Sequence, residues 1–359
     1  MKKLLCLALA LSLLFSLFSC GGAKYEPRES TEEEARVVMT YSIDGATYEV
    51  KYELYRAIFL NFISEYDYKK DGFFDTDEGK AAVDSVNETF KSLSADIYAT
   101  LHLAKKIGYD PYSADADKAV SELIAEDVEN EYFGGDYEKY LSELKNINLN
   151  YSTQDLILRY QLAYDKIVDY YKGTVDPDNP STDMTEGALE YTEDDVRDFY
   201  FGESSVRVSI IKISHDLPLS EARVIRDKLA AMTDEKDALY YASSSTISDP
   251  YDVYMGAVIG RNSSDYVFYG DVMKEAFALG LNETGKVHDI SSGVEPIYWV
   301  LYRTAKTEEH FLECYDDIAD SYLSEKIGAI LGGVTDSLKK SAETTEVFDS
   351  ISHKEIEMK

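Results

Sequence analysis

The chain has 359 residues and a formal net charge of −32 at pH 7, with 68 Asp and Glu residues against 36 Lys and Arg residues. So strong an excess of carboxylates disfavours nucleic acid and broad anionic membrane surfaces as partners, because their phosphates repel it. The length is sufficient for two packed units, so the order of elements along the chain indicates the architecture.

The N-terminus carries the signals for export. Residues 1–19 predict a signal peptide, because a basic start precedes the apolar run Leu4–Phe18, which is too short to span a membrane well. Cys20 closes the sequence Leu-Phe-Ser-Cys, which resembles a bacterial lipobox. The resemblance implies cleavage before Cys20, lipid on its sulfur, and a place in the cell envelope on the extracytoplasmic side of a bacterial membrane. An ordinary secretory signal, cut near Gly21, is the alternative.

The cysteines exclude a structural disulfide in the exported chain. Cys6 leaves with the signal peptide, and Cys314 then remains alone beside the lipidated Cys20. Residues 20–36 are polar and show no periodicity, so we predict a tether between the lipid and the folded part of the chain.

Residues 37–190 predict a mostly helical unit that begins with a hairpin. Two β-rich runs flank the Asp-Gly pair at 44–45, which is typical of a tight hairpin turn. Apolar residues recur at helical spacing over 52–66, and we expect further helices within 79–171. Residues 172–189 contain Pro and Gly without periodicity, which indicates a linker or a long loop.

Residues 191–305 predict a second unit. Thr192 and Asp195 have the spacing of a capping box at the start of a short acidic helix. That helix runs into 206–213, VRVSIIKI, a β-branched and largely buried strand. A helix, a glycine-punctuated segment, another helix and a last strand follow. From 306 to 359 the chain is predicted to be mainly helical again.

This order of segments resembles the PrsA-type foldases and SurA-type chaperones. SIDGATYEVKYE resembles the family's opening strand, turn and helix, STQDLILRYQLAYDKIV resembles its later helix, and AFALGLNETGKV resembles a stretch of parvulin-type prolyl isomerases. The resemblance implies an α+β fold, in which a parvulin-like α/β domain (191–305) is inserted into a mostly helical SurA-like chaperone module. Residues 37–190 and 306–359 would form that module by packing together. Partly unfolded exported polypeptides are the implied partners, with no cofactor.

The catalytic positions of the family carry over only in part. Parvulins use two strand histidines, an acidic residue and an apolar proline pocket, and the matching positions here are Ile210, Tyr298 or Trp299, Asp249, Phe268 and Val272. Ile210 replaces the first histidine. A one-residue gap decides whether Tyr298 or Trp299 replaces the second.

These losses bear on catalysis. Prolyl isomerisation needs no nucleophile or metal, but its amide barrier is about 18–20 kcal/mol. A site lowers the barrier by gripping the proline and by favouring the twisted amide through placed polar groups. Ile210 and an aromatic residue keep a pocket apolar and supply little hydrogen bonding. We therefore predict a lipid-anchored chaperone whose parvulin-like domain binds polypeptide without catalysis.

Two other functions remain open. One is an active prolyl isomerase that uses shifted residues such as Asp249 and His288. The other is a lipoprotein that binds a small solute or scaffolds a complex. His215 is a further stand-in for a lost histidine, although both it and His288 are more simply interpreted as exposed loop residues.

Residues 67–78, DYKKDGFFDTDE, have part of the spacing of a calcium-binding loop. Lys69 stands at the third ligand position, where it would place a cation among the ligands. We therefore predict an acidic turn between two helices, and no metal site.

Overall fold

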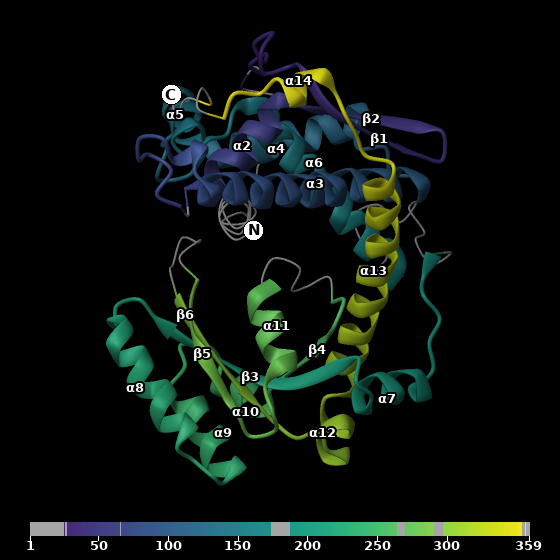
Figure 1. Ribbon diagram of the computed structural model, residues 1–359. Helices are drawn as coiled ribbons and strands as arrows, with labels where there is room; N and C mark the ends of the chain where they lie inside the picture. The colour runs from purple at the N-terminus through teal and green to yellow at the C-terminus, as the bar shows by residue number, and fades with distance from the viewer. Residues whose placement is uncertain are drawn as a thin grey trace. The chain divides into compact units, whose positions relative to one another are not determined.

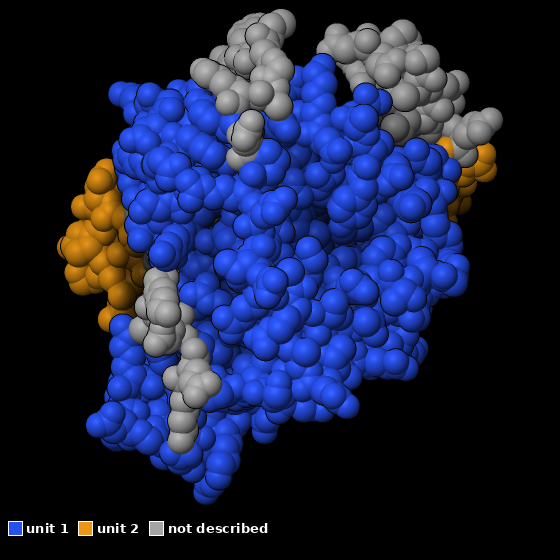
Figure 2. All heavy atoms as spheres, turned by 90° about the horizontal axis from the view of Figure 1, so that it is seen from above, with its two compact units in different colours: residues 1–170, 330–359 blue, residues 171–329 orange. Residues whose placement is uncertain are grey.

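The computed structural model describes residues 25, 27–64, 66–173, 187–263, 270–290, 297–353 and 356. Helices and two antiparallel sheets make the chain an α+β protein, as predicted. Contacts within the chain divide it into unit 1, residues 1–170 and 330–359, and unit 2, residues 171–329 (Figure 2). The sequence predicts domain boundaries after residues 190 and 305. By its contacts, the structure groups residues 171–190 and 306–329 with unit 2.

Unit 1 opens with the hairpin of β1 (Val37–Ile43) and β2 (Ala46–Lys51). Its two turn residues, Asp44 and Gly45, both have positive φ angles, of 49° and 78°. The Asp-Gly pair favours that conformation, which matches the twist of the two strands.

Helices of very different length form the rest of unit 1 (Figure 1). The longest, α3, begins where the Thr76 side chain accepts a hydrogen bond from the backbone N–H of Gly79. The helices that precede the C-terminal segment are α2 (Tyr52–Ile63), the 3₁₀ helix η1 (Phe73–Asp75), α3 (Asp77–Lys106), α4 (Ala114–Glu129), α5 (Tyr137–Asn146) and α6 (Tyr151–Lys172).

The C-terminal segment returns to unit 1. β7 (Glu343–Thr344) pairs antiparallel with β1, which gives the sheet order β2-β1-β7. In α14 (Glu346–Asp349), the Phe348 ring stacks 6.1 Å from Phe90 of α3 and lies edge-on 5.3 Å from Tyr55 of α2. Unit 1 therefore contains segments from both the N-terminal and the C-terminal parts of the chain, and unit 2 lies between these segments in the sequence.

The described part of the predicted tether packs on α5. The Tyr25 ring lies 5.0 Å from the Tyr137 ring, and the Arg28 guanidinium is 2.5 Å from a carboxylate oxygen of Glu138. These contacts place Tyr25 and Arg28 of the 20–36 segment against α5.

Unit 2 is built on a four-stranded antiparallel sheet of order β4-β3-β6-β5. The strands are β3 (Ser205–Ser214), β4 (Ala257–Gly260), β5 (Thr284–Ile290) and β6 (Ile297–Arg303). The helices are α7 (Glu193–Phe201), α8 (Leu219–Ala230), α9 (Glu235–Ser244), α10 (Pro250–Met255), α11 (Gly270–Ala278), α12 (Glu308–Glu313) and α13 (Tyr315–Lys340), the last of which continues into unit 1. The capping box of Thr192 and Asp195 is present at the start of α7, as predicted. Within the described residues, no helix is long and apolar enough to cross a membrane.

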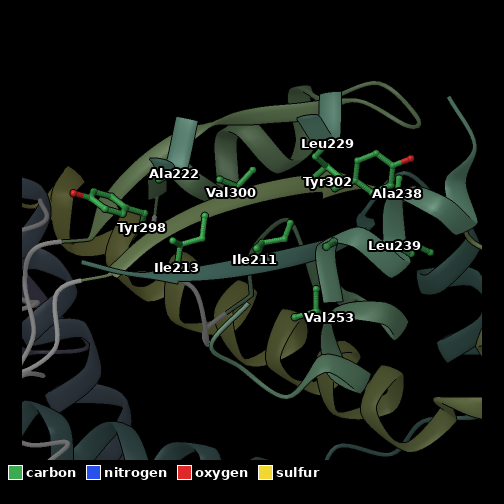
Figure 3. Close-up of a cluster of buried hydrophobic side chains, with 11 residues drawn as sticks. Ile211, Ile213, Ala222, Leu229, Ala238, Leu239, Val253, Tyr298, Val300 and Tyr302 are labelled. Atoms are coloured by element: carbon green, nitrogen blue, oxygen red, sulfur yellow. The ribbon is translucent and has the colours of Figure 1, made fainter. Parts of the chain in front are cut away.

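Helices cover both faces of this sheet (Figure 1). On the face that we call the α8 face, Ile211, Ile213 and Val300 pack with buried residues of α8, α9 and α10 (Figure 3). On the opposite face, the α11 face, Val208 and Leu301 pack with α11. Since strand side chains alternate between faces, neighbouring residues of β3 and β6 belong to different cores.

Candidate functional site on the α11 face

The strand register decides which aromatic residue shares a face with Ile210. Trp299 pairs with Lys212 across β3 and β6, and Tyr298 pairs with Ile213. Trp299 and Ile210 both belong to the α11 face, where they pack in one cluster with Val272. Tyr298 belongs to the α8 face. Of the two predicted alternatives, Trp299 is therefore the one that lies with Ile210 and Val272.

A row of three side chains crosses the sheet at this point. The Lys212 ammonium lies 5.5 Å from the centre of the Trp299 ring, within the range of a cation–π contact. On the other side of Trp299, His288 is its partner in β5. The row Lys212–Trp299–His288 places a cation, an indole and an imidazole on the α11 face.

His288 is fixed by a carboxylate from α11. Its residue is only 3% exposed, and its Nε2 lies 2.6 Å from Oε2 of Glu275. Oε1 of Glu275 accepts a further hydrogen bond from the backbone N–H of Lys286 at 3.1 Å. The pair joins α11 to β5. The interpretation of His288 as an exposed loop residue is wrong, because it lies in a strand.

His215 has a different environment from His288. Its ring stacks on Tyr298 with the centroids 4.0 Å apart, and its Nε2 lies 3.1 Å from a carboxylate oxygen of Asp289. Tyr298 belongs to the α8 face, so His215 is not grouped with Ile210 and Trp299.

Asp249 is also apart from the α11 face. It is exposed, and its carboxylate caps α10 by accepting a hydrogen bond from the backbone N–H of Tyr251 at 2.8 Å. α10 packs on the α8 face through Val253. The structure therefore brings together Ile210, Trp299 and Val272 and does not group Asp249 with them. Phe268 and Cys20 lie outside the described residues.

The acidic segment 67–78 contains turns, η1 and the first residues of α3. Gly72 adopts a left-handed conformation with φ of 74°, and Phe73, which follows it, is buried. Across the described ranges of the chain, no group of three or more His, Cys, Asp or Glu side chains is arranged to hold a metal ion.

Neither a protein-family model nor a curated protein matches the chain. Among solved structures, it is similar to the foldase protein PrsA of Streptococcus pneumoniae, with 16% identity, coverage of 73% of this chain and 91% of that chain, and a TM-score of 0.27. It is similar to PrsA from Bacillus subtilis, with 16% identity, coverage of 73% and 87%, and a TM-score of 0.24. It is also similar to PrsA from Lactococcus lactis, with 16% identity, coverage of 87% of this chain and 96% of that chain, and a TM-score of 0.23.

Proposed function

We propose that the chain is a lipid-anchored extracytoplasmic chaperone that holds partly unfolded exported polypeptides, and that unit 2 binds polypeptide without catalysing prolyl isomerisation. The observation that carries the proposal is the composition of the α11 face. Ile210 and Trp299 stand there, at positions that the family resemblance assigns to histidines. Neither supplies what two imidazoles would offer to a twisted amide, because Ile210 has no polar side-chain atom and Trp299 can only donate.

Burial of an apolar side chain needs no proton donor, so the partly exposed part of this face, at Ile210, can bind an apolar side chain when catalysis is lost. The discontinuous architecture of unit 1 supports a chaperone module formed by both ends of the chain. Unit 1 also exposes tyrosine rings, including Tyr112 and Tyr132, which are 55% and 60% exposed. A tyrosine offers an apolar ring with a polar tip, which suits contact with varied extended chains.

The test uses purified protein that lacks residues 1–20. We expect it to suppress aggregation of a chemically denatured client at near-stoichiometric ratios and to leave the rate of a proline-limited refolding reaction unchanged. Saturable acceleration of that refolding would contradict the proposed lack of catalysis. Failure to protect any of several denatured clients would contradict the chaperone function and favour a solute-binding or scaffolding lipoprotein.

An active isomerase remains the second candidate, and the placement of His288 favours it. An imidazole oriented by Glu275 lies beside Trp299 on the same sheet face. If this histidine polarises the prolyl amide, His288→Gln abolishes any acceleration of refolding. His215→Gln is the matched control, since it removes a histidine that the structure does not group with Ile210 and Trp299. Acceleration that survives His288→Gln would exclude this role.

A further inference from the structure

Residues 27–36 are part of the fold of unit 1 and complete the start of α2. The backbone N–H of Tyr52, in the first turn of α2, donates to the carbonyl oxygen of Arg36 at 2.8 Å. The backbone N–H of Glu53 donates to the carbonyl oxygen of Glu34 at 3.1 Å. A helix leaves its first N–H groups without acceptors, and the N-cap residue of α2 makes no side-chain hydrogen bond to them. The two carbonyl groups therefore supply acceptors that the helix itself lacks.

The carboxylate of Glu53 ties the same segment to α6. Glu53 is 6% exposed, and its Oε2 accepts hydrogen bonds from Oγ of Ser30 at 2.5 Å and from Nδ2 of Asn150 at 2.8 Å. Its Oε1 accepts a hydrogen bond at 2.8 Å from Oγ of Ser152, which lies in α6. Hydrogen bonds to a carboxylate are stronger than those between neutral groups, so Ser30 is fixed where α2 meets α6.

The first described residues of the chain lie on α5. The Tyr25 ring packs against Tyr137, and its hydroxyl donates to the carbonyl oxygen of Gly135 at 3.5 Å. Arg28 makes its ion pair with Glu138, the next residue of α5. The N-terminal part of the chain is therefore held at the first turn of α5.

Only a short stretch of chain separates this contact from the proposed lipid. Tyr25 is the fifth residue after Cys20, and five residues span at most about 18 Å, whatever their conformation. The helix α3, with 30 residues, is about 45 Å long, so unit 1 is much larger than this span. A lipid on Cys20 would therefore hold one side of unit 1 near the membrane and keep the opposite side away from it.

The side chains around the first turn of α5 suit a membrane interface. Tyr132 is 60% exposed, and the Lys139 ammonium lies 4.0 Å from the centre of its ring. Tyrosine is enriched at membrane–water interfaces, and lysine can extend its ammonium from apolar surface toward water. The exposed carboxylates of Glu131 and Asp136 belong to the same stretch of chain, and they would repel anionic headgroups. The surface therefore fits zwitterionic headgroups.

We propose that the short link between Cys20 and Tyr25 holds the α5 side of unit 1 against the bilayer, an inference that rests on the proposed lipid anchor. Residues 27–36, packed on α2, α5 and α6, would fix the point at which the link leaves the fold. An unpacked chain from 20 to 36 could span about 55 Å and would impose no orientation. The β1–β2 turn, on the opposite side of unit 1 from α5 (Figure 1), would point away from the membrane. Unit 1 would thus meet exported polypeptides at the membrane surface.

The experiment measures fluorescence energy transfer from a dye on unit 1 to acceptor-labelled headgroups in phosphatidylcholine vesicles. The full-length protein is purified with its lipid and bound to the outer leaflet, and it carries Cys314→Ser so that one introduced cysteine takes the dye. Ser142→Cys places the dye on an exposed position of α5, and Thr47→Cys places it on an exposed position of β2 near the turn. We expect the transfer efficiency from position 142 to be about twice that from position 47, because the link is less than half as long as α3.

An insertion separates the effect of the short link from direct binding of the α5 surface. A flexible insert of about 16 Gly and Ser residues between Gly22 and Ala23 should bring the two transfer efficiencies together, because it lets unit 1 turn relative to the bilayer. The same insert after Lys359 is the matched control and should leave the difference unchanged.

Equal transfer from the two positions, or higher transfer from position 47, would overturn the proposal. A difference that survives the insertion after Gly22 would also overturn it, because the orientation would then come from the surface and not from the link. Failure of the unaltered protein to carry lipid and remain on the vesicles refutes the proposed anchor, whereas equal transfer in a protein that is anchored refutes the orientation alone.

Discussion

Trp299 and His288 are opposite each other across β6 and β5, and the imidazole of His288 is held at 2.6 Å by Glu275 from the helix that covers the same sheet face. An apolar anchor and a positioned polar group are thus neighbours on the α11 face. Together with Glu275, these two residues join three elements, since α11, β5 and β6 each contribute one side chain. Loss of the contact between His288 and Glu275 should therefore weaken the packing of α11 on the sheet.

His288→Ala should destabilise unit 2 by about 3 kcal/mol, because it leaves Oε2 of the largely buried Glu275 carboxylate without its charged or polar partner. The double variant His288→Ala/Glu275→Ala should cost less than the sum of the two single variants. Trp299 is the only tryptophan of the chain and lies in this core, so its fluorescence in a urea titration reports the unfolding of unit 2. His215→Ala serves as the control and should cost about 1 kcal/mol or less, since its partner Asp289 is half-exposed. Equal losses for the two histidine variants would contradict this account.

The sequence predicts the elements of this fold better than their contacts. The Asp-Gly hairpin, the capping box at Thr192 and the strand that contains Ile210 all follow from local patterns, and all are present. The choice between Tyr298 and Trp299 depends on a register that is set by hydrogen bonds to a strand about 90 residues earlier in the chain. A one-residue shift exchanges the two faces, and local patterns do not determine it.

The position of His288 shows a second limit. Its partner Glu275 comes from a helix, and no spacing in the sequence indicates that α11 and β5 meet. Alternation along TGKVHDI is the one signal that predicts a strand there, and glycine and charged residues interrupt it.

Cys20→Ala should prevent lipid attachment, because the thiol is the proposed acceptor. We expect the variant to accumulate unprocessed or to be released from membranes, with metabolic labelling by a radioactive fatty acid lost. Cell fractionation and labelling measure the two effects. Cys6→Ala is the control and should be processed and retained normally. Normal processing and membrane retention of the Cys20 variant would refute lipid anchoring at this residue.

His310 should make unit 2 sensitive to acid. Its residue is 3% exposed, its Nδ1 is hydrogen-bonded to the Tyr200 hydroxyl at 2.9 Å, and burial lowers its pKa to about 4. Between pH 6.5 and pH 4 the unfolded state binds more protons than the folded state, so the free energy of unfolding falls as the pH falls. Each unit of pKa difference corresponds to about 1.4 kcal/mol, so the total loss reaches about 3 kcal/mol.

The measurement is urea unfolding at pH 7 and pH 4.5, followed by the fluorescence of Trp299. His310→Gln should be less stable at pH 7 and should lose part of the difference between the two pH values. Tyr200→Phe keeps the ring and removes the hydroxyl, so it should cost about 1 kcal/mol and retain the acid sensitivity. An identical pH dependence in the unaltered protein and in His310→Gln would show that this imidazole does not titrate on unfolding.

Asp127 should make unit 1 sensitive to alkali. This α4 residue is 3% exposed, and burial, with a smaller contribution from Glu126, raises its pKa to about 8. The folded state therefore binds a proton that the unfolded state releases above pH 4. Stability conferred by that proton is present in full below pH 4 and is lost as the pH rises to about 8.

Asp127→Asn keeps the size of the side chain and removes its charge. At pH 8 it should raise the free energy of unfolding of unit 1 by several kcal/mol, since each pKa unit corresponds to about 1.4 kcal/mol, and at pH 4 it should change little. Thermal unfolding followed by far-ultraviolet circular dichroism at the two pH values measures the effect on the helices. Glu122→Gln, on the same helix and paired only loosely with Lys118 at 3.7 Å, is the control and should change stability by less than about 0.5 kcal/mol at either pH. If the Asn variant is no more stable than the unaltered protein at pH 8, the Asp127 carboxylate is solvated in the folded state. In that case α4 packs less tightly on α5 and α6 than the structure shows.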